Sequence, residues 1–194
     1  VITAGFKELG EEGAAVEAEM LSKARDAGML LIGPNCQGIC CPKNRLFPWM
    51  PMLFHPPHGN ISFVAQSGNV LNMLIGPTVM SGLGVAKAVS SGNEADISTE
   101  EYLSYLVEDP DTEVIVAYIE GLDDGRRFLE LSREVTRRKP VIALKGGRTR
   151  SGMSAARSHT GAMAVSETLF EAACRQAGII LTSTIDEASG TASA

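Results

Sequence analysis

The segment EVIVAYIEG, residues 113–121, is the clearest predicted strand of this chain. Its six consecutive apolar residues, rich in β-branched side chains, are typical of a buried β-strand, and Glu120 and Gly121 end it. The stretch at 123–139 then predicts a helix, and PVIALKGG at 140–147 predicts a second strand. Two strands joined through a helix by short connections predict a parallel pair.

The same alternation continues on both sides of this unit. Ser98 and Glu101, three residues apart, form a predicted capping box at the start of one helix. The fold class is therefore α/β, with a parallel sheet between two layers of helices. The further strands are expected at 61–66, 84–93 and 178–183, and the further helices at 69–82, 98–110 and 165–178.

The first sixty residues follow a different pattern. A helix is expected at 10–28 and a short apolar strand at 29–35, and the chain opens on what resembles the end of a strand. Five of the nine prolines lie at 40–60, which predicts a connector without helix or strand and a domain boundary near 56–60. Because the chain begins within a pattern and without methionine, we expect it to be a piece of a longer protein. The small, polar residues at 187–194 predict a disordered tail.

Composition excludes several classes of function. The net charge of −6 argues against binding to nucleic acids or anionic membranes, and no apolar run approaches the length of about 20 residues that a membrane span needs. The spacing of the four cysteines fits no zinc site, so we expect no metal in this chain. Reduced thiols in a cytoplasmic protein are the expected state of Cys36, Cys40, Cys41 and Cys174.

In open parallel sheets, ligands bind at the carboxyl ends of the strands. That rule selects five places in this chain. They are Thr3–Ala4–Gly5, Asn35–Cys36, Ser67–Gly68, Ser91–Gly92–Asn93 and Glu120–Gly121.

Ser67 and Gly68 lie between a predicted strand and the first turn of a predicted helix. The free backbone N–H groups of that turn and the helix dipole can bind an anion. An ordinary helix cap accounts for the same pattern, so these two residues leave both interpretations open.

His159 lies in RSHTGAM, residues 157–163, between a glycine-rich basic loop and a predicted helix. Its small neighbours, including Gly161, indicate that the ring is not packed in a core, and an imidazole there can act as a base or nucleophile. Glu120 can orient that ring by accepting a hydrogen bond from it. The alternatives are a surface or capping histidine, and a salt bridge from Glu120 to an arginine. The basic residues Lys145, Arg148, Arg150 and Arg157 form either a solvated surface or a phosphate-binding set.

Five motifs occur in order along almost the whole chain and together closely resemble the NDP-forming acyl-CoA synthetases, relatives of the succinyl-CoA synthetase alpha subunit. The motifs are GPNCQGI (33–39), VAQSGN (64–69), SSGNEADIS (90–98), YIEG (118–121) and KPVIALKGGRTRSGMSAARSHTGAMA (139–164).

The resemblance implies two domains. Residues 1–56 would be the back part of a Rossmann-type CoA-binding domain with its proline-rich connector, and 57–194 a flavodoxin-like ligase domain. The front part of the CoA-binding domain would lie upstream of Val1. The CoA contacts implied for this chain are Thr3, Ala4, Gly5, Asn35 and Cys36.

The resemblance also implies a reaction. Acyl-CoA, NDP and phosphate would interconvert with acid, CoA and NTP through an acyl phosphate and a phosphohistidine on His159, with Glu120 as its partner. Ser67, Gly68 and Gly161 would bind the phosphoryl group. The chain has no Walker motif. ATP/ADP or GTP/GDP and magnesium would therefore bind an ATP-grasp domain, either fused or a separate beta subunit, in an oligomer.

The helix at 69–82 begins NVLNML, without the tyrosine and glutamate of the succinyl enzymes, so the resemblance implies a small carboxylic acid other than succinate. Two alternatives remain. One is a CoA-sensing or regulatory module of a related acyltransferase-type protein without ligase turnover. The other is a flavodoxin-like module that binds a phosphate ligand without chemistry. The presence of both His159 and Glu120 favours the ligase.

Overall fold

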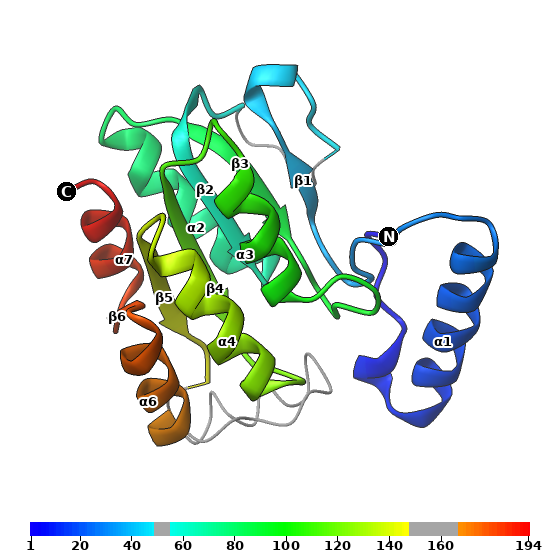
Figure 1. Ribbon diagram of the computed structural model, residues 1–194. Helices are drawn as coiled ribbons and strands as arrows, with labels where there is room; N and C mark the ends of the chain where they lie inside the picture. The colour runs from blue at the N-terminus through cyan, green and yellow to red at the C-terminus, as the bar shows by residue number, and fades with distance from the viewer. Residues whose placement is uncertain (49–54, 148–166) are drawn as a thin grey trace.

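The computed structural model describes residues 1–48, 55–147 and 167–194, which build an α/β fold around one six-stranded sheet (Figure 1). The strand order is β1-β3-β2-β4-β5-β6, and β2 to β6 run parallel. The order in which the strands are added reverses between β2 and β4, so the sheet is doubly wound. The strands are β1 (Gly38–Cys40), β2 (His58–Ala65), β3 (Val85–Ser90), β4 (Val114–Ile119), β5 (Val141–Lys145) and β6 (Ile180–Thr182).

Helices cover both faces of the sheet, which confirms the three-layer prediction. One core lies between the sheet and α3, α4 and α6, where Leu103, Phe128 and Phe170 are buried. The other lies under α2 and α7, where Leu71 and Ala188 are buried. Helix α1 lies to one side of the sheet (Figure 1). The helices are α1 (Glu11–Asp26), α2 (Gly68–Met80), α3 (Thr99–Glu108), α4 (Gly125–Thr136), α6 (Glu167–Ala177) and α7 (Ile185–Ala192), with the 3-10 turns η1 (Lys7–Leu9) and η2 (Pro42–Asn44).

The chain forms no strand at 29–35 or at 1–6, which corrects two expectations. The two segments lie side by side, but only two backbone hydrogen bonds join them, from the Val1 amino group to the Ile32 carbonyl and from the Asn35 N–H to the Thr3 carbonyl. A strand needs a ladder of such bonds along a neighbour. Leu30 is 80% exposed, so the apolar run that predicted a buried strand does not lie in a core here.

The proline-rich segment contributes to the sheet, contrary to the expectation that 40–60 contains neither helix nor strand. Strand β1 ends at Cys40 and pairs antiparallel with β3, 3-10 turn η2 follows, and β2 begins already at His58. The sheet is therefore mixed at this edge. The division of the chain into 1–56 and 57–194 stays a prediction.

The predicted disordered tail is helix α7. Thr184 caps it by accepting a hydrogen bond from the Glu187 N–H, 3.1 Å away. Its small residues allow close approach to α2, and the Ser189 hydroxyl donates to the Leu74 carbonyl of that helix. Composition predicted the opposite because small side chains carry little hydrophobic signal, although they permit tight helix packing.

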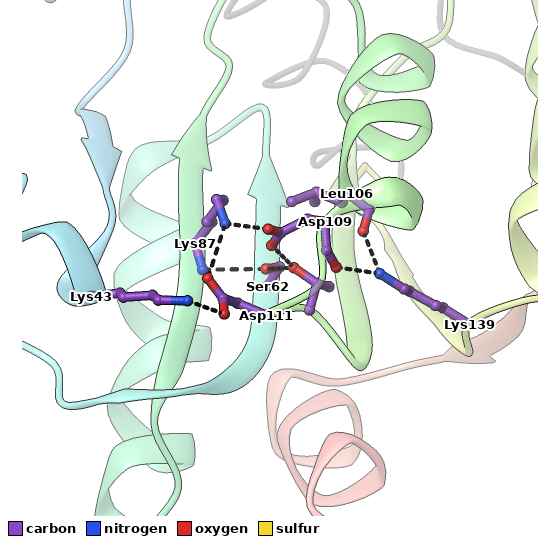
Figure 2. A network of polar contacts seen from close by, with 8 residues as sticks. Lys43, Ser62, Lys87, Leu106, Asp109, Asp111 and Lys139 are labelled. Atoms are coloured by element: carbon purple, nitrogen blue, oxygen red, sulfur yellow. Dashed lines mark hydrogen bonds and ion pairs between the residues drawn. The ribbon is translucent and has the colours of Figure 1, made fainter.

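A polar network lies at the amino ends of the central strands (Figure 2). Lys87 of β3 pairs with Asp109 at 2.6 Å, and Lys43 of η2 pairs with Asp111 at 2.5 Å. Lys139 donates to the carbonyls of Leu106 and Asp109. The network ties the connector and the α3–β4 loop to the sheet through two lysine–aspartate pairs.

Within the described ranges, no helix combines the length and apolar character that crossing a membrane requires. All four cysteines are buried and free of disulfide bonds. Burial raises the pKa of Cys40 and of Cys174 to about 12, so both thiols are protonated at neutral pH.

Candidate functional site

The carboxyl ends of β2 and β4 lie next to each other at the point where the strand order reverses. The two strands pair directly, with Ala65 opposite Tyr118. Ser67 and Gly68 follow β2, and Glu120 follows β4, so the fold brings these three predicted residues to one edge. This is the position at which doubly wound folds bind ligands.

Ser67 and Gly68 form the start of α2, as predicted. Ser67 is the N-cap in an extended conformation, and its side chain makes no capping hydrogen bond. The first turn contains no acidic residue, so the helix dipole there is not offset by a local carboxylate. A Cβ atom on Gly68 would collide with Cγ of Gln37, so glycine allows the 33–39 segment to approach the helix start.

Glu120 is 7% exposed at the end of β4. Its backbone N–H donates to Oε1 of Gln66 at 2.6 Å, and its carbonyl accepts from Nζ of Lys145 at 2.6 Å. The Tyr118 hydroxyl bonds to Glu120, and burial together with this carboxylate raises the pKa of Tyr118 above its usual range. The backbone of Glu120 is thus held from two neighbouring strands.

The start of the glycine-rich loop packs directly on this carboxylate. A Cβ atom on Gly146 would lie 2.5 Å from the Tyr118 hydroxyl oxygen and 2.9 Å from Cγ of Glu120. Any side chain at 146 would therefore displace Glu120, which explains a glycine at this point of the loop.

Lys145 is part of the site and not of a solvated surface. Its ammonium group donates to the carbonyls of Glu120 and Gly146 and lies 5.7 Å from the centre of the Phe170 ring. Burial lowers the pKa of Lys145, while the Glu120 carboxylate acts in the opposite direction. The other members of the basic set, Arg148, Arg150 and Arg157, lie outside the described residues.

His159 and Gly161 also lie outside the described residues. Their assignment as the phosphorylated histidine and a phosphate-binding glycine stays a prediction. The described strand end at Lys145 and the start of α6 at Glu167 flank the segment that contains them.

The residues implied for CoA contact form a second group. Thr3, Ala4 and Gly5 are exposed, and the hydrogen bond from Asn35 N–H to the Thr3 carbonyl, 2.9 Å long, joins the two predicted turns. Cys36 is buried, and its thiol donates to the Val1 carbonyl at 3.4 Å. The assignment of Thr3, Ala4, Gly5, Asn35 and Cys36 to CoA stays a prediction, and the buried Cys36 side chain serves packing.

Asn93 connects this second group to the end of β3. Its buried side-chain amide donates to the carboxylates of Glu8 and Glu17, at 2.6 and 2.9 Å, and its oxygen accepts from Asn35. Burial raises the pKa of Glu8, but hydrogen bonds from Asn93 and from the N–H groups of Gly5 and Phe6 outweigh it and lower that pKa to about 2. The strand-end rule selected Asn93 but not its two carboxylate partners.

Gln66 was not predicted as a site residue. It is 5% exposed, and its amide group contacts the backbone of both Glu120 and Gly121. A polar residue directly after the buried run 61–65 is the signal that could have found it, because a buried amide needs partners. Among the described residues, no three His, Cys, Asp or Glu side chains are grouped so as to hold a metal ion.

Comparison with known proteins gives a consistent result. The succinyl-CoA ligase like flavodoxin domain matches residues 58–194. The alpha subunit of the ADP-forming acetate–CoA ligase II of Pyrococcus furiosus is 42% identical over 187 residues, which are 96% of this chain and 40% of that protein. The ADP-forming 4-hydroxybutyrate–CoA ligase of Nitrosopumilus maritimus is 38% identical over 96% of this chain and 27% of its own length.

A solved structure supports the same assignment. The dinucleotide-forming acetyl-coenzyme A synthetase 1 of Ca. Korarchaeum cryptofilum, in complex with phosphate and ADP, superposes with a TM-score of 0.88 and 38% identity over 97% of this chain and 40% of that chain. This chain spans about 40% or less of the length of these relatives. The match over 58–194, on a sheet of this strand order, shows that the chain belongs to the succinyl-CoA ligase-like flavodoxin domain family.

Proposed function

We propose that this chain is the CoA-binding and phosphoryl-accepting part of an NDP-forming acid–CoA ligase. In the direction of NTP synthesis, phosphate attacks the thioester carbonyl, which releases CoA and leaves an acyl phosphate. A ring nitrogen of His159 then attacks phosphorus, which releases the acid and leaves a phosphohistidine. A terminal phosphate oxygen of NDP finally takes the phosphoryl group, which forms NTP and frees the imidazole.

One observation carries this proposal. The helix start at Ser67–Gly68 and the acid Glu120 lie at one edge of the sheet, joined through the side chain of Gln66. Backbone N–H groups suit the phosphoryl oxygens, and a carboxylate suits the second ring nitrogen of a phosphorylated histidine. A helix cap alone would not need the buried acid beside it.

The roles of the residues follow from their chemistry. Glu120 accepts a hydrogen bond from one ring nitrogen of His159, which leaves the other nitrogen as the nucleophile. The N–H groups of the first turn of α2 stabilise the negative charge that develops on phosphorus oxygens. Gly161 lies two residues beyond His159, where it completes the phosphoryl-binding set.

CoA would bind across the exposed turn at Thr3, Ala4 and Gly5 and along Asn35 and Cys36. The hydrogen bond between Asn35 and Thr3 supports this, because it holds both turns in one surface. In the extra length of the relatives we place the rest of the CoA-binding domain and an ATP-grasp domain, fused or as a beta subunit. That domain would supply the nucleotide and magnesium sites of a cytoplasmic, oligomeric enzyme.

The acid is proposed to be a small carboxylic acid without a second carboxylate. The names of two relatives specify acetate and 4-hydroxybutyrate. At the start of α2, neutral amides surround the helix end, where Gln37 bonds to Asn69 at 3.1 Å and to Asn72 at 2.7 Å. No charged group among these three side chains would pair with a second carboxylate.

Phosphorylation of His159 tests the proposal directly. The full-length protein that contains this chain is combined with its nucleotide-binding partner, magnesium and γ-labelled ATP. We expect label that is stable to base and labile to acid, located on His159 and absent from His159→Ala. Addition of the acid and CoA should discharge it with formation of the thioester.

Two results would overturn the proposal. Label that persists in His159→Ala would remove the histidine from the reaction. A well-folded wild-type protein that binds CoA but takes no label would instead indicate the CoA-sensing module, and one that binds only phosphate would indicate a ligand-binding module without chemistry.

A further inference from the structure

Gln66 occupies the junction between the strand ends that build the site. The last backbone bond between β2 and β4 at this edge runs from the Gln66 N–H to the Tyr118 carbonyl at 3.2 Å. Beyond this bond the two segments separate, with Ser67 following β2 and Glu120 following β4. The side chain of Gln66 spans the gap.

The side-chain amide of Gln66 forms the next hydrogen bonds to the chain after β4, beyond the last backbone bond between β2 and β4. Its Oε1 accepts from the N–H groups of Glu120 and Gly121, at 2.6 and 3.0 Å, and its Nε2 donates to the Gly121 carbonyl at 2.9 Å. One side chain thus satisfies three backbone groups that would otherwise be buried without partners. An amide offers both an acceptor and a donor in this geometry, whereas an ionised carboxylate offers acceptors alone.

The contacts around Gln66 extend to the neighbouring strands as well. Glu94, after β3, also bonds to Gln66, and it accepts from the Ser91 hydroxyl at 2.7 Å and the Thr99 hydroxyl at 2.6 Å. From the other side, Lys145 of β5 holds the Glu120 carbonyl. Gln66 is therefore the central member of a chain of contacts across the ends of four strands.

We propose that Gln66 is a positioning residue that sets the separation between the phosphoryl-binding start of α2 and the Glu120 carboxylate. This inference rests on the proposed function, since the separation matters only if a phosphoryl group lies between the two. Gln66 directly precedes Ser67, and its side chain binds the backbone N–H of Glu120. A shift of this amide would therefore move Glu120 relative to the start of α2. Misplacement by about 1 Å can slow a reaction about 100-fold.

Two variants of the full-length enzyme test this. Gln66→Met keeps the size and removes both hydrogen-bonding functions. Gln66→Glu keeps the acceptor but places a second oxygen against the Gly121 carbonyl when ionised. We expect the rate of His159 phosphorylation to fall about 10- to 100-fold in both at pH 8, with KM for CoA unchanged, because the CoA turns lie elsewhere.

The dependence of the phosphorylation rate on pH distinguishes a positioning role of Gln66 from a general loss of structure in the variants. The introduced carboxyl would be buried between Glu94, after β3, and the backbone of Glu120, after β4. Lys145 of β5 binds the carbonyl of Glu120, and the Tyr118 hydroxyl bonds to its side chain. Burial, which also raises the pKa of the neighbouring Glu94, raises the pKa of a carboxyl group at this position, while Lys145 acts in the opposite direction. When protonated, the introduced carboxyl donates to the Gly121 carbonyl again. The rate of Gln66→Glu relative to wild type should therefore rise as the pH falls from 8 to 6, whereas that of Gln66→Met should stay low.

Gln176→Met is the matched control, because Gln176 is exposed on α6 and its side chain bonds to Arg133 of α4. It should leave rate and profile unchanged. Full activity in Gln66→Met, or a Gln66→Glu ratio that does not change with pH, would overturn the inference. A wild-type enzyme that takes no label would instead overturn the proposed function, so the two failures are distinct.

Discussion

Polar side chains at the two edges of the sheet bind different kinds of partner. At the amino edge, Lys87 pairs with Asp109 and Lys43 with Asp111, and only Lys139, among the lysines drawn there, binds backbone carbonyls (Figure 2). At the carboxyl edge, the buried Gln66 and the half-buried Lys145 bind backbone groups. The first arrangement neutralises charge within the protein, whereas the second holds the chain in place around Glu120 and the start of α2.

The two edges therefore differ in whether they can bind a ligand. A paired network stabilises the loops that it joins but offers a ligand little, because its charges are already compensated. At the carboxyl edge, the contacts of Gln66 and Lys145 fix the backbone beside Glu120 next to the start of α2, where the proposed function places the phosphoryl group. Substitutions at the amino edge should therefore change stability, and those at the carboxyl edge should change the reaction.

The largest effect is expected from Glu120→Gln at the carboxyl edge. The amide keeps the size of the side chain but cannot orient and stabilise the imidazole as a carboxylate does, so phosphorylation of His159 should slow roughly 1,000-fold. The melting temperature should change little, because the backbone contacts of residue 120 remain. Rapid-quench labelling measures the rate, with Glu108→Gln, on the exposed end of α3, as the control. A variant with full turnover would make Glu120 purely structural.

Lys87→Met at the amino edge should give the reverse result. It leaves Asp109 buried without its cation and should lower the free energy of unfolding by about 3 kcal/mol, with the phosphorylation rate unchanged. Burial raises the pKa of Asp109, but Lys87 and Thr112 outweigh it and lower that pKa. The folded pKa lies below the unfolded one, so this stability is present above about pH 4 and is lost as the pH falls further.

Urea unfolding at pH 7 and at pH 3 measures this. The difference between wild type and Lys87→Met should shrink at the lower pH, where Asp109 is protonated. An equal difference at both values would mean that lost packing of the lysine side chain, and not the ion pair, accounts for the effect.

A smaller contrast is expected within α2 itself. In Gly68→Ala, the new methyl group would collide with Cγ and Cδ of Gln37 and should cost about 1–2 kcal/mol, together with a shift of the helix start. Gly76→Ala, in the same helix, meets nothing within 4 Å and should stabilise by about 0.5–1 kcal/mol. Thermal unfolding and CoA binding of the pair measure this. Equal effects at both positions would refute the close approach of Gln37.

The strands and helices from 61 to 147 could be predicted because each carries its own signal, as the apolar run of β4 and the capping residues of α3 show. In the predicted capping box at the start of α3, the Glu101 carboxylate accepts from the Ser98 N–H at 2.8 Å. Ser67 and Glu120 could be assigned to one edge for the same reason, since the end of each strand was evident. Helix α7 and strand β1 were missed because their formation depends on what they pack or pair with.

Local sequence patterns encode periodicity and strand ends, and they were enough to predict the alternation of strands and helices, the class of the fold and the edge at which Ser67, Gly68 and Glu120 gather. Only the tertiary structure decided that β1 pairs antiparallel, that the tail is a helix, and that Gln66 and Lys145 hold the Glu120 backbone. Those features depend on contacts between residues far apart in the chain. The position of Gln66 after a buried strand indicates that its amide needs partners, but the local pattern does not identify the backbone of Glu120 as one of them.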